Sequence, residues 1–249
     1  MRAFLAVLLS ASIIHAAPVP KPTGKEVVEK KFGKINDPKG ETGFKMDGDT
    51  LVVTMPANAE KDAVILGGAS VDSRIVLLTC PSIKLSEVKG EFQVEYSVTA
   101  LLASDAKPIR EKGSRIDIGA GLCADFGEHG KLVVTLQSRR DLPKEETRQH
   151  GFDVITGMDA GVSGRLQVKP TLNTTKEISE SGKWKVRQVF KKGMFHLHYT
   201  PPKDVEQEAS SFSCSDADPA KLSLVFFHSS DTKHEIRIDD FKITPLEKK

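Results

Sequence analysis

The chain has 249 residues, of which 28% are charged, and its formal net charge is +2. Lysine and arginine are interspersed with aspartate and glutamate, so the sequence has no basic patch of the kind that binds nucleic acid or an anionic membrane. β-Sandwiches commonly reach about 200–250 residues as one unit, so this length does not require a second domain. The bulk properties predict one globular domain that binds no nucleic acid.

The first 17 residues resemble a secretory signal peptide. Arg2 is followed by an apolar run over 3–14, and Ala16-Ala17 precede a proline-rich stretch over 18–22. A positive start, an apolar stretch and small residues before a break are the parts of such a signal. A membrane-spanning helix needs about 20 residues. The sequence therefore predicts cleavage near Ala16-Ala17, a secreted or periplasmic protein and no membrane span; a buried N-terminal helix is the alternative.

Residues 18–26 are rich in proline and lysine, with little to bury, and predict a disordered lead-in to one domain over 27–249. Within that domain, apolar and polar residues alternate most clearly over 92–99. This pattern predicts a half-buried strand with Phe92, Val94, Tyr96 and Val98 facing inward. Similar stretches predict further strands over 50–55, 74–79, 115–126, 131–138, 164–168, 184–190, 194–199, 222–227 and 235–243.

The predicted strands are short and are separated by polar turns. The best hairpin joins 186–190 to 194–199 through Lys191-Lys192-Gly193. After the first 17 residues, no apolar stripe of helical period persists beyond about two turns. These features predict an all-β fold, an antiparallel β-sandwich. The densely charged stretch 139–151 is predicted to be a long surface loop or a short helix.

Three cysteines, Cys80, Cys123 and Cys214, allow at most one intramolecular disulfide and three possible pairings. Each lies in or beside an apolar stretch. A buried free cysteine behaves as a small hydrophobic residue, and we expect this of Cys123. The disulfide state of the other two stays open.

Several short motifs occur in the order typical of a known group of domains. They are Asp37-Pro38, Gly90-Glu91-Phe92, Gly119-Ala120-Gly121-Leu122 and, in the last strand, Asp239-Asp240-Phe241. On these motifs the chain resembles the concanavalin A-like lectin/glucanase superfamily over residues 32–245. Within it, the chain is similar to secreted bacterial domains of unknown function of the regulation-of-enolase type. The resemblance implies a jelly-roll sandwich that is lectin-like and binds carbohydrate.

Glycosidases of that superfamily place their carboxylates on one strand as Glu-x-Asp-x-x-Glu, because retaining hydrolysis needs two close carboxyl groups. The nearest stretch here, Glu235 to Asp240, departs from this pattern. We therefore expect no catalytic residues and a non-catalytic extracytoplasmic binding module, whose partner is a glycan or an envelope protein. A divergent glycoside hydrolase or lyase and a structural or interaction protein of the cell envelope are the alternatives.

The strand over 194–199 places His196 and His198 on one face, since alternate residues of a strand point the same way. Together with Arg187 on the neighbouring strand, they are the candidate ligand-binding residues. Two imidazoles can bind a metal, but a zinc site needs at least one more protein ligand. The sequence names no such ligand, so no metal site is predicted here.

Asp239 and Asp240 have two interpretations. Some sandwiches similar to this one hold a structural calcium ion through an aspartate near the last strand, and carboxylates are suitable ligands. A β-bulge explains the pair equally well, because one extra residue would return Phe241 and Ile243 to the face of Ile236. No cofactor is predicted beyond this possible calcium ion.

Overall fold

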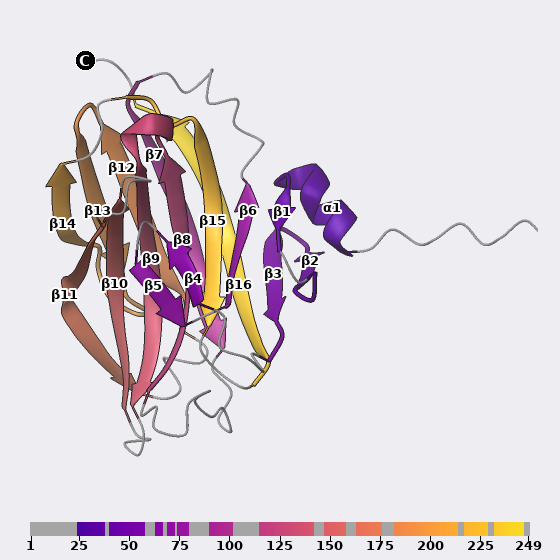
Figure 1. The fold of residues 1–249 in the computed structure, drawn as a ribbon. Coiled ribbons are helices and arrows are strands. Elements are labelled where there is room, and N and C mark those ends of the chain that lie inside the picture. Colours follow the sequence, from indigo (N-terminus) through magenta and orange to yellow (C-terminus); the bar gives the residue numbers. More distant parts are fainter. Residues whose placement is uncertain are drawn as a thin grey trace, which may run out of the picture.

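The computed structural model describes residues 24–37, 40–57, 63–66, 69–72, 74–79, 90–101, 115–141, 147–157, 163–175, 182–213, 217–228 and 232–246. Two β-sheets pack face to face, and a short helix lies beside them (Figure 1). The predicted signal peptide and residues 18–23 of the lead-in lie outside the described residues, as do Cys80 and Cys214.

In the described part of the chain, the two main sheets contain seven strands each. In the first, sheet A, the order is β1 (Ile35–Asn36), β6 (Arg74–Thr79), β15 (Lys221–His228), β8 (Arg115–Asp125), β9 (Lys131–Asp141), β10 (Thr147–Gly157) and β11 (Ser163–Thr175). In the second, sheet B, it is β14 (Gln207–Ser213), β13 (Met194–Thr200), β12 (Trp184–Lys191), β7 (Phe92–Leu101), β16 (His234–Pro245), β3 (Thr50–Met55) and β2 (Gly43–Asp47). A separate hairpin joins β4 (Ala63–Leu66) to β5 (Ala69–Asp72), and a 3₁₀ turn spans Gly127–His129.

All the strand pairs are antiparallel, so the predicted sandwich is confirmed. The predicted hairpin is confirmed as well: β12 and β13 are joined by a turn in which Gly193 has a φ of 71°. A positive φ of this size is readily adopted by glycine because it has no Cβ.

The core lies between the sheets and is built by alternate residues of each strand. The four residues of β7 that were predicted to face inward are all buried in it, as is Trp184. At one end, Phe190 of β12 stacks on Phe92 at 4.6 Å between ring centroids and meets Phe195 edge-on at 5.2 Å. Burying one such side chain contributes about 1.5–3 kcal/mol. This row of rings therefore stabilises the packing of strands β7, β12 and β13 at that end.

The central strands of sheet A carry buried side chains on their outer face as well. Cys123, Val133, Val225 and Phe227 are buried on β8, β9 and β15, yet they do not belong to the core between the sheets. Gly119 makes room on this face, since a Cβ there would lie 2.5 Å from the ring of Phe227. The centre of this outer face therefore offers little open surface to a ligand.

The helix α1 (Gly24–Lys31) was not predicted, and residues 24–26 of the predicted disordered lead-in form its first turn. Val28 and Phe32 lie four residues apart, and both are buried. Residues at this spacing share one side of a helix, and the ring of Phe32 lies 6.0 Å from that of Phe241. Two apolar residues were too short a pattern to predict a helix.

No helix in the described part of the chain has the length and apolarity needed to cross a membrane.

The prediction of a loop or helix over 139–151 is wrong for most of that stretch. Strand β9 continues to Asp141, and β10 begins at Thr147. The backbone of Arg139–Asp141 pairs with that of Arg115–Asp117 on β8. This pairing satisfies the backbone whatever the side chains carry, so charge density alone does not exclude a strand. Strand β14 was not predicted, because its sequence has little apolar alternation.

Cys123 is a free, buried cysteine, as expected. Burial, and secondarily the nearby carboxylate of Asp125, raises the pKa of its thiol to about 11 from an ordinary value of 9.0. The thiolate is the reactive form. A shift of this size lowers the thiolate fraction about 100-fold at mildly alkaline pH.

We therefore expect Cys123 to resist iodoacetamide in the folded protein and to be alkylated at least about 100-fold faster after unfolding. Peptide mass spectrometry after a timed reaction measures this, because it separates Cys123 from Cys80 and Cys214. Equal rates in the folded and the unfolded protein would contradict the buried position of the thiol.

Candidate functional site

The outer face of sheet B carries a row of charged side chains. Cα partners across five neighbouring strands place Glu208, His198, Arg187, Glu95 and Lys242 in register, from β14 to β16. Directly opposite residues on antiparallel strands have Cβ atoms about 4.5–5.5 Å apart. The permanent charges alternate in sign along this row, with His198 between the first two, so neighbouring side chains attract one another.

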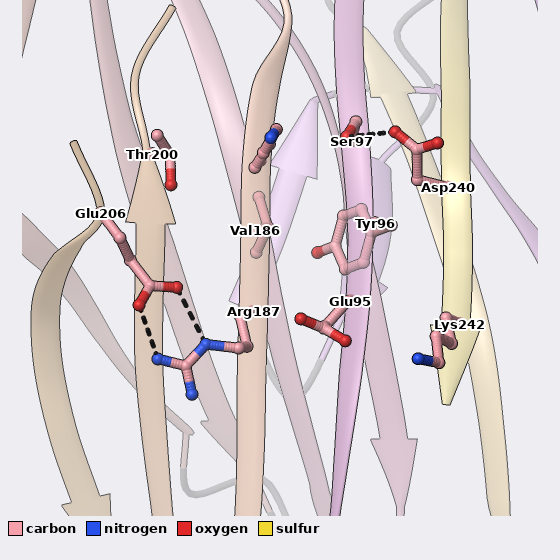
Figure 2. Close-up of a pocket in the computed structure, with 10 residues that line it drawn as sticks. Glu95, Tyr96, Ser97, Val186, Arg187, Thr200, Glu206, Asp240 and Lys242 are labelled. Carbon is pink, nitrogen blue, oxygen red and sulfur yellow. Dashed lines mark hydrogen bonds and ion pairs between the residues drawn. The ribbon is translucent and has the colours of Figure 1, made fainter. Parts of the chain in front are cut away.

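A groove of about 450 Å³ lies over the centre of this row (Figure 2). Its volume falls within the range of small-ligand sites, about 300–1,000 Å³. Tyr96 and Val186 are buried beneath it and form the floor. Its polar lining residues are Glu95 and Ser97 on β7, Lys185 and Arg187 on β12, Thr200 at the end of β13, Glu206 before β14, and Asp240 and Lys242 on β16.

Arg187 and Glu206 form a two-pronged ion pair at one side of the groove (Figure 2). Arg187 Nε donates to Glu206 Oε1 at 2.9 Å, and Arg187 Nη2 donates to Glu206 Oε2 at 2.8 Å. These hydrogen bonds raise the pKa of Arg187 and lower that of Glu206. Because both side chains are partly exposed, the pair adds at most about 1 kcal/mol to stability. Its main effect is to hold the guanidinium in place, with three of its five N–H groups left over.

A tight loop over 201–206 brings Glu206 to this position. The amide of Asp204 donates to the carbonyl of Pro201 at 3.2 Å, and the amide of Val205 donates to Asp204 Oδ1 at 2.8 Å. Lys203 adopts a φ of 65°, which is uncommon for a residue other than glycine. The loop is thus fixed by its own hydrogen bonds as well as by the ion pair.

The opposite side of the groove is shaped by a β-bulge. The register between β16 and β7 shifts between Asp239 and Lys242, and Asp240 has a φ of 55°. The predicted bulge is therefore confirmed. It keeps Phe241 and Ile243 packed against the core while turning the side chain of Asp240 toward the groove.

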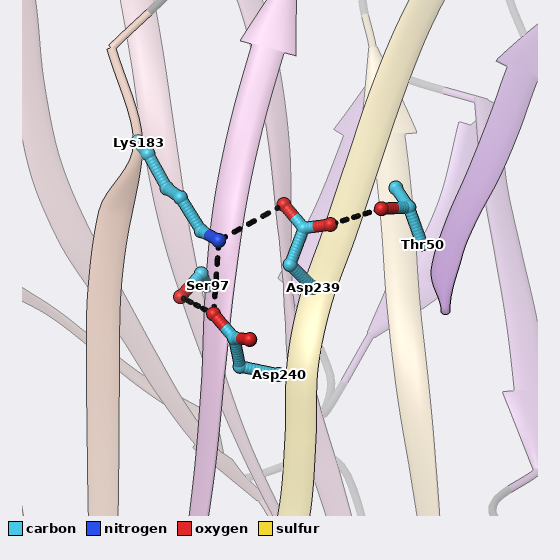
Figure 3. Close-up of polar contacts among 5 residues, drawn as sticks. All are labelled: Thr50, Ser97, Lys183, Asp239 and Asp240. Carbon is cyan, nitrogen blue, oxygen red and sulfur yellow. Dashed lines mark hydrogen bonds and ion pairs between the residues drawn. The ribbon is translucent and has the colours of Figure 1, made fainter. Parts of the chain in front are cut away.

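Lys183 links the two aspartates of the bulge (Figure 3). Its Nζ lies 2.9 Å from Asp240 Oδ2 and 3.4 Å from Asp239 Oδ2. Ser97 also donates to Asp240, at 3.1 Å, and Thr50 donates to Asp239. The hydrogen bond from Lys183 is the main reason that the pKa of Asp240 is lowered.

The residues around the bulge do not fit a calcium cage. Calcium takes six to eight oxygen ligands, whereas the two carboxylates here already share the ammonium of Lys183. Among the described residues, no group of three or more His, Cys, Asp or Glu side chains is placed to hold a metal ion.

The three predicted site residues all lie on the outer face of sheet B, but only Arg187 lines the groove. His198 is the direct cross-strand partner of Arg187, beside the groove. His196 lies two residues further along β13, where its Nδ1 is 2.7 Å from Ser211 Oγ. Ser211 donates its single proton to Glu208 at 2.8 Å, so Nδ1 of His196 must be the donor in the first contact. His196 is thus engaged at the edge of the sheet, away from the groove.

Sequence reasoning missed Glu95, Ser97, Lys185, Asp240 and Lys242 as lining residues. The polar face of the strand over 92–99 was visible in the sequence and contained the first two. Their neighbours could not be identified, because the strand pairs with segments about 90 and 145 residues further along the chain.

No family model matches the chain, and no curated protein is similar to it in sequence. Solved structures do share its fold. A functionally unknown protein from Saccharomyces cerevisiae is 10% identical, with a TM-score of 0.53 over 88% of this chain and 98% of that one. A legume lectin-like domain from Entamoeba histolytica is 9% identical, with a TM-score of 0.53 over 95% and 100%. An alginate lyase from Klebsiella pneumoniae is 12% identical, with a TM-score of 0.51 over 83% and 85%.

At these identities the likeness shows the fold alone. It supports the concanavalin A-like sandwich that the motifs implied. The finer assignment to the regulation-of-enolase type stays a prediction, since no sequence match accompanies the structural ones.

The charge of Arg187 is expected to hold down the pKa of its partner His198. Burial is the first cause of the lowered pKa of His198 and the positive charge of Arg187 the second, while Glu206 and Glu208 act in the opposite direction. In Arg187→Met the two glutamates remain without the arginine, so the pKa of His198 should rise. NMR titration of the His198 ring signals measures this shift.

The control is Lys191→Met, which removes a positive charge from the exposed end of the same strand. It should leave the titration of His198 unchanged. Because the folded state favours neutral His198, the stability that this provides is lost as the pH falls through its folded pKa, and Arg187→Met should reduce that loss. A pKa of His198 that is unchanged or lower in Arg187→Met would contradict the coupling.

The left-handed backbone of Asp240 in the bulge leads to a prediction about which substitutions there reduce stability. Asparagine tolerates this conformation, whereas a β-branched residue does not. The side chain of Asp240 is 68% exposed, so its charge contributes little. We expect Asp240→Asn to lower the free energy of unfolding by less than about 1 kcal/mol and Asp240→Val by about 2 kcal/mol or more. Urea denaturation measures both, and equal losses would contradict the strained backbone.

Proposed function

We propose that this protein is a non-catalytic, extracytoplasmic binding module and that the groove on the outer face of sheet B is its saccharide-binding surface. The observation that carries the proposal is the composition of the groove, whose walls consist of charged side chains and hydroxyl groups over a flat strand surface. A second observation is that the centre of the other sheet's outer face is buried.

The lining residues match the hydrogen-bonding needs of a sugar. Each sugar hydroxyl both donates and accepts, and the groove supplies both partners. Arg187, Lys185 and Lys242 donate, the carboxylates of Glu95 and Glu206 accept, and the hydroxyl of Thr200 does both. Among the side chains whose burial the structure describes, no large aromatic one is exposed. Recognition would therefore depend on polar contacts rather than on ring stacking.

The acidic residues of the groove are better suited to binding than to hydrolysis. A general acid in a glycosidase needs a raised pKa so that it carries a proton at neutral pH. The pKa of Glu206 is lowered by Arg187, and that of Asp240 is lowered by Lys183. Both groups are thus held as anions, in which form they accept hydrogen bonds from a ligand. For these two residues, this favours the binding module over the alternative of a divergent glycoside hydrolase.

The fold and the N-terminal sequence add weaker support. Sandwiches of this shape occur in a legume lectin-like domain and in an alginate lyase, although a fold does not by itself assign a function. The signal-like first 17 residues are the reason for placing the module outside the cytoplasm.

The test is a saccharide array followed by calorimetry with the best binders, comparing the wild type with Arg187→Met. Hydrogen bonds to a charged group are worth about 1.5–3 kcal/mol, so we expect this substitution to weaken binding by about 10-fold or more.

Arg237→Met provides a matched control. Arg237 lies on a different strand of sheet B, β16, and, like Arg187, it donates a hydrogen bond to a glutamate, from its Nε to Glu235 Oε1 at 2.9 Å. It does not line the groove, so its loss should change the affinity by less than about twofold. The proposal fails if no saccharide binds, or if Arg187→Met and Arg237→Met bind equally well. Stable co-purification with one envelope protein in that case would favour the structural alternative.

A further inference from the structure

We infer that the groove selects an anionic oligosaccharide, one that bears at least two carboxylate or sulfate groups, and that Lys185 and Lys242 are the residues that select it. The inference rests on the proposed saccharide binding and concerns which class of saccharide the same groove takes.

The acids of the groove are all engaged by other side chains of the protein. Glu206 receives two hydrogen bonds from Arg187. Asp240 contacts the ammonium of Lys183 and the hydroxyl of Ser97. Glu95 accepts a hydrogen bond from the side-chain amide of Gln93 at 3.2 Å. The negative charges of Glu206 and Asp240, which would repel an anionic ligand, are therefore compensated within the protein, whereas Glu95 has only a hydrogen bond from a neutral amide.

Two of the three bases that line the groove are not compensated in this way. In the part of the chain that the structure describes, neither Lys185 nor Lys242 forms an ion pair. Lys185 and Lys242 are both exposed, and both line the groove. An ammonium group that forms no ion pair in a concave site attracts an anion, and carboxylate and sulfate both satisfy it.

The positions of the two lysines define the kind of anion. Lys185 is the register partner of Ser97, and Lys242 is the register partner of Glu95, two residues away on the same strand. The lysines thus lie two strands apart and about two residues apart along the strands. With strands about 4.8 Å apart and about 3.4 Å per residue, their Cα atoms are roughly 12 Å apart.

One carboxylate could not contact both ammonium groups across this span without drawing the two side chains together over Glu95. Two anionic groups on successive or alternate sugars of an oligosaccharide could each meet one lysine. Glu95 lies between the lysines on β7, where its carboxylate can accept hydrogen bonds from the hydroxyl groups of the intervening sugar.

The experiment is calorimetry of the full chain with four ligands: galacturonate monomer, a galacturonate trisaccharide, a neutral trisaccharide of the same linkage, and a sulfated trisaccharide. At low salt we expect an anionic trisaccharide to bind about 10-fold more tightly than the neutral one, as two exposed ion pairs would give. The advantage should shrink at high salt, because salt screens exposed charges. A gain for either anionic trisaccharide, or for both, supports the inference and identifies the anion.

The double variant Lys185→Met/Lys242→Met should lower the affinity for the anionic trisaccharide to that for the neutral one, with the neutral affinity changed by less than about threefold. Its control, Lys45→Met/Lys191→Met, removes the same charge from exposed residues of sheet B outside the groove and should keep the preference.

The outcomes separate this inference from the proposed function. If the neutral trisaccharide binds as tightly as the anionic ones, or if the double variant keeps the preference, the inference is overturned while saccharide binding stands. If the galacturonate monomer binds as tightly as the galacturonate trisaccharide, the role of the spacing between the two lysines is overturned. If no ligand binds in the groove, the proposed function fails as well.

Discussion

The register of β7 between β12 and β16 determines both the core and the groove. Successive residues of a strand point to opposite faces, so the side chains that alternate along β7 serve the two faces in turn. Phe92, Val94 and Tyr96 are buried in the core. Glu95 and Ser97, which alternate with them along β7, line the groove on the opposite face. A slip of one residue would place the carboxylate of Glu95 in the core, at a cost of several kcal/mol. Burial of the aromatic residues therefore fixes the positions of the polar ones.

The bulge at Asp240 lets β16 place apolar side chains in the core and polar side chains on the outer face along its whole length. Before it, Ile236 and Ile238 are buried in the core, and after it, Phe241 and Ile243 pack against the same core. An uninterrupted strand would have placed the second pair on the outer face. The extra residue restores the apolar alternation and at the same time lets two successive carboxylates, Asp239 and Asp240, reach the same lysine. Packing of the core and the shape of the groove rim thus have one local cause.

A feature of the fold or the groove could be predicted from the sequence when the residues that determine it lie close together in the chain. The inward face of β7, the β12–β13 hairpin, the bulge and the buried Cys123 each follow from residues within about ten positions, and all were predicted. Strand β14 and the ends of β9 and β10 are set by pairing to distant strands, and local polarity misled their assignment. The groove combines residues 95, 187 and 242, so it depends on a strand order that one sequence does not reveal. Arg187 was found because its partner His198 lies across a local hairpin.

The contrast between the two sheets limits where this fold can meet a ligand. A sandwich has two outer faces, and in this protein the centre of one is closed by its own side chains, including Phe227 over Gly119. Glycine at that position allows the ring to lie against the strand. A side chain of the sheet itself therefore covers this part of its outer face. On the open face, ion pairs hold Arg187 to Glu206 and Asp240 to Lys183 in the absence of a ligand. Because a site that is already ordered loses little entropy on binding, even the few unmatched groups there can decide which ligand is preferred.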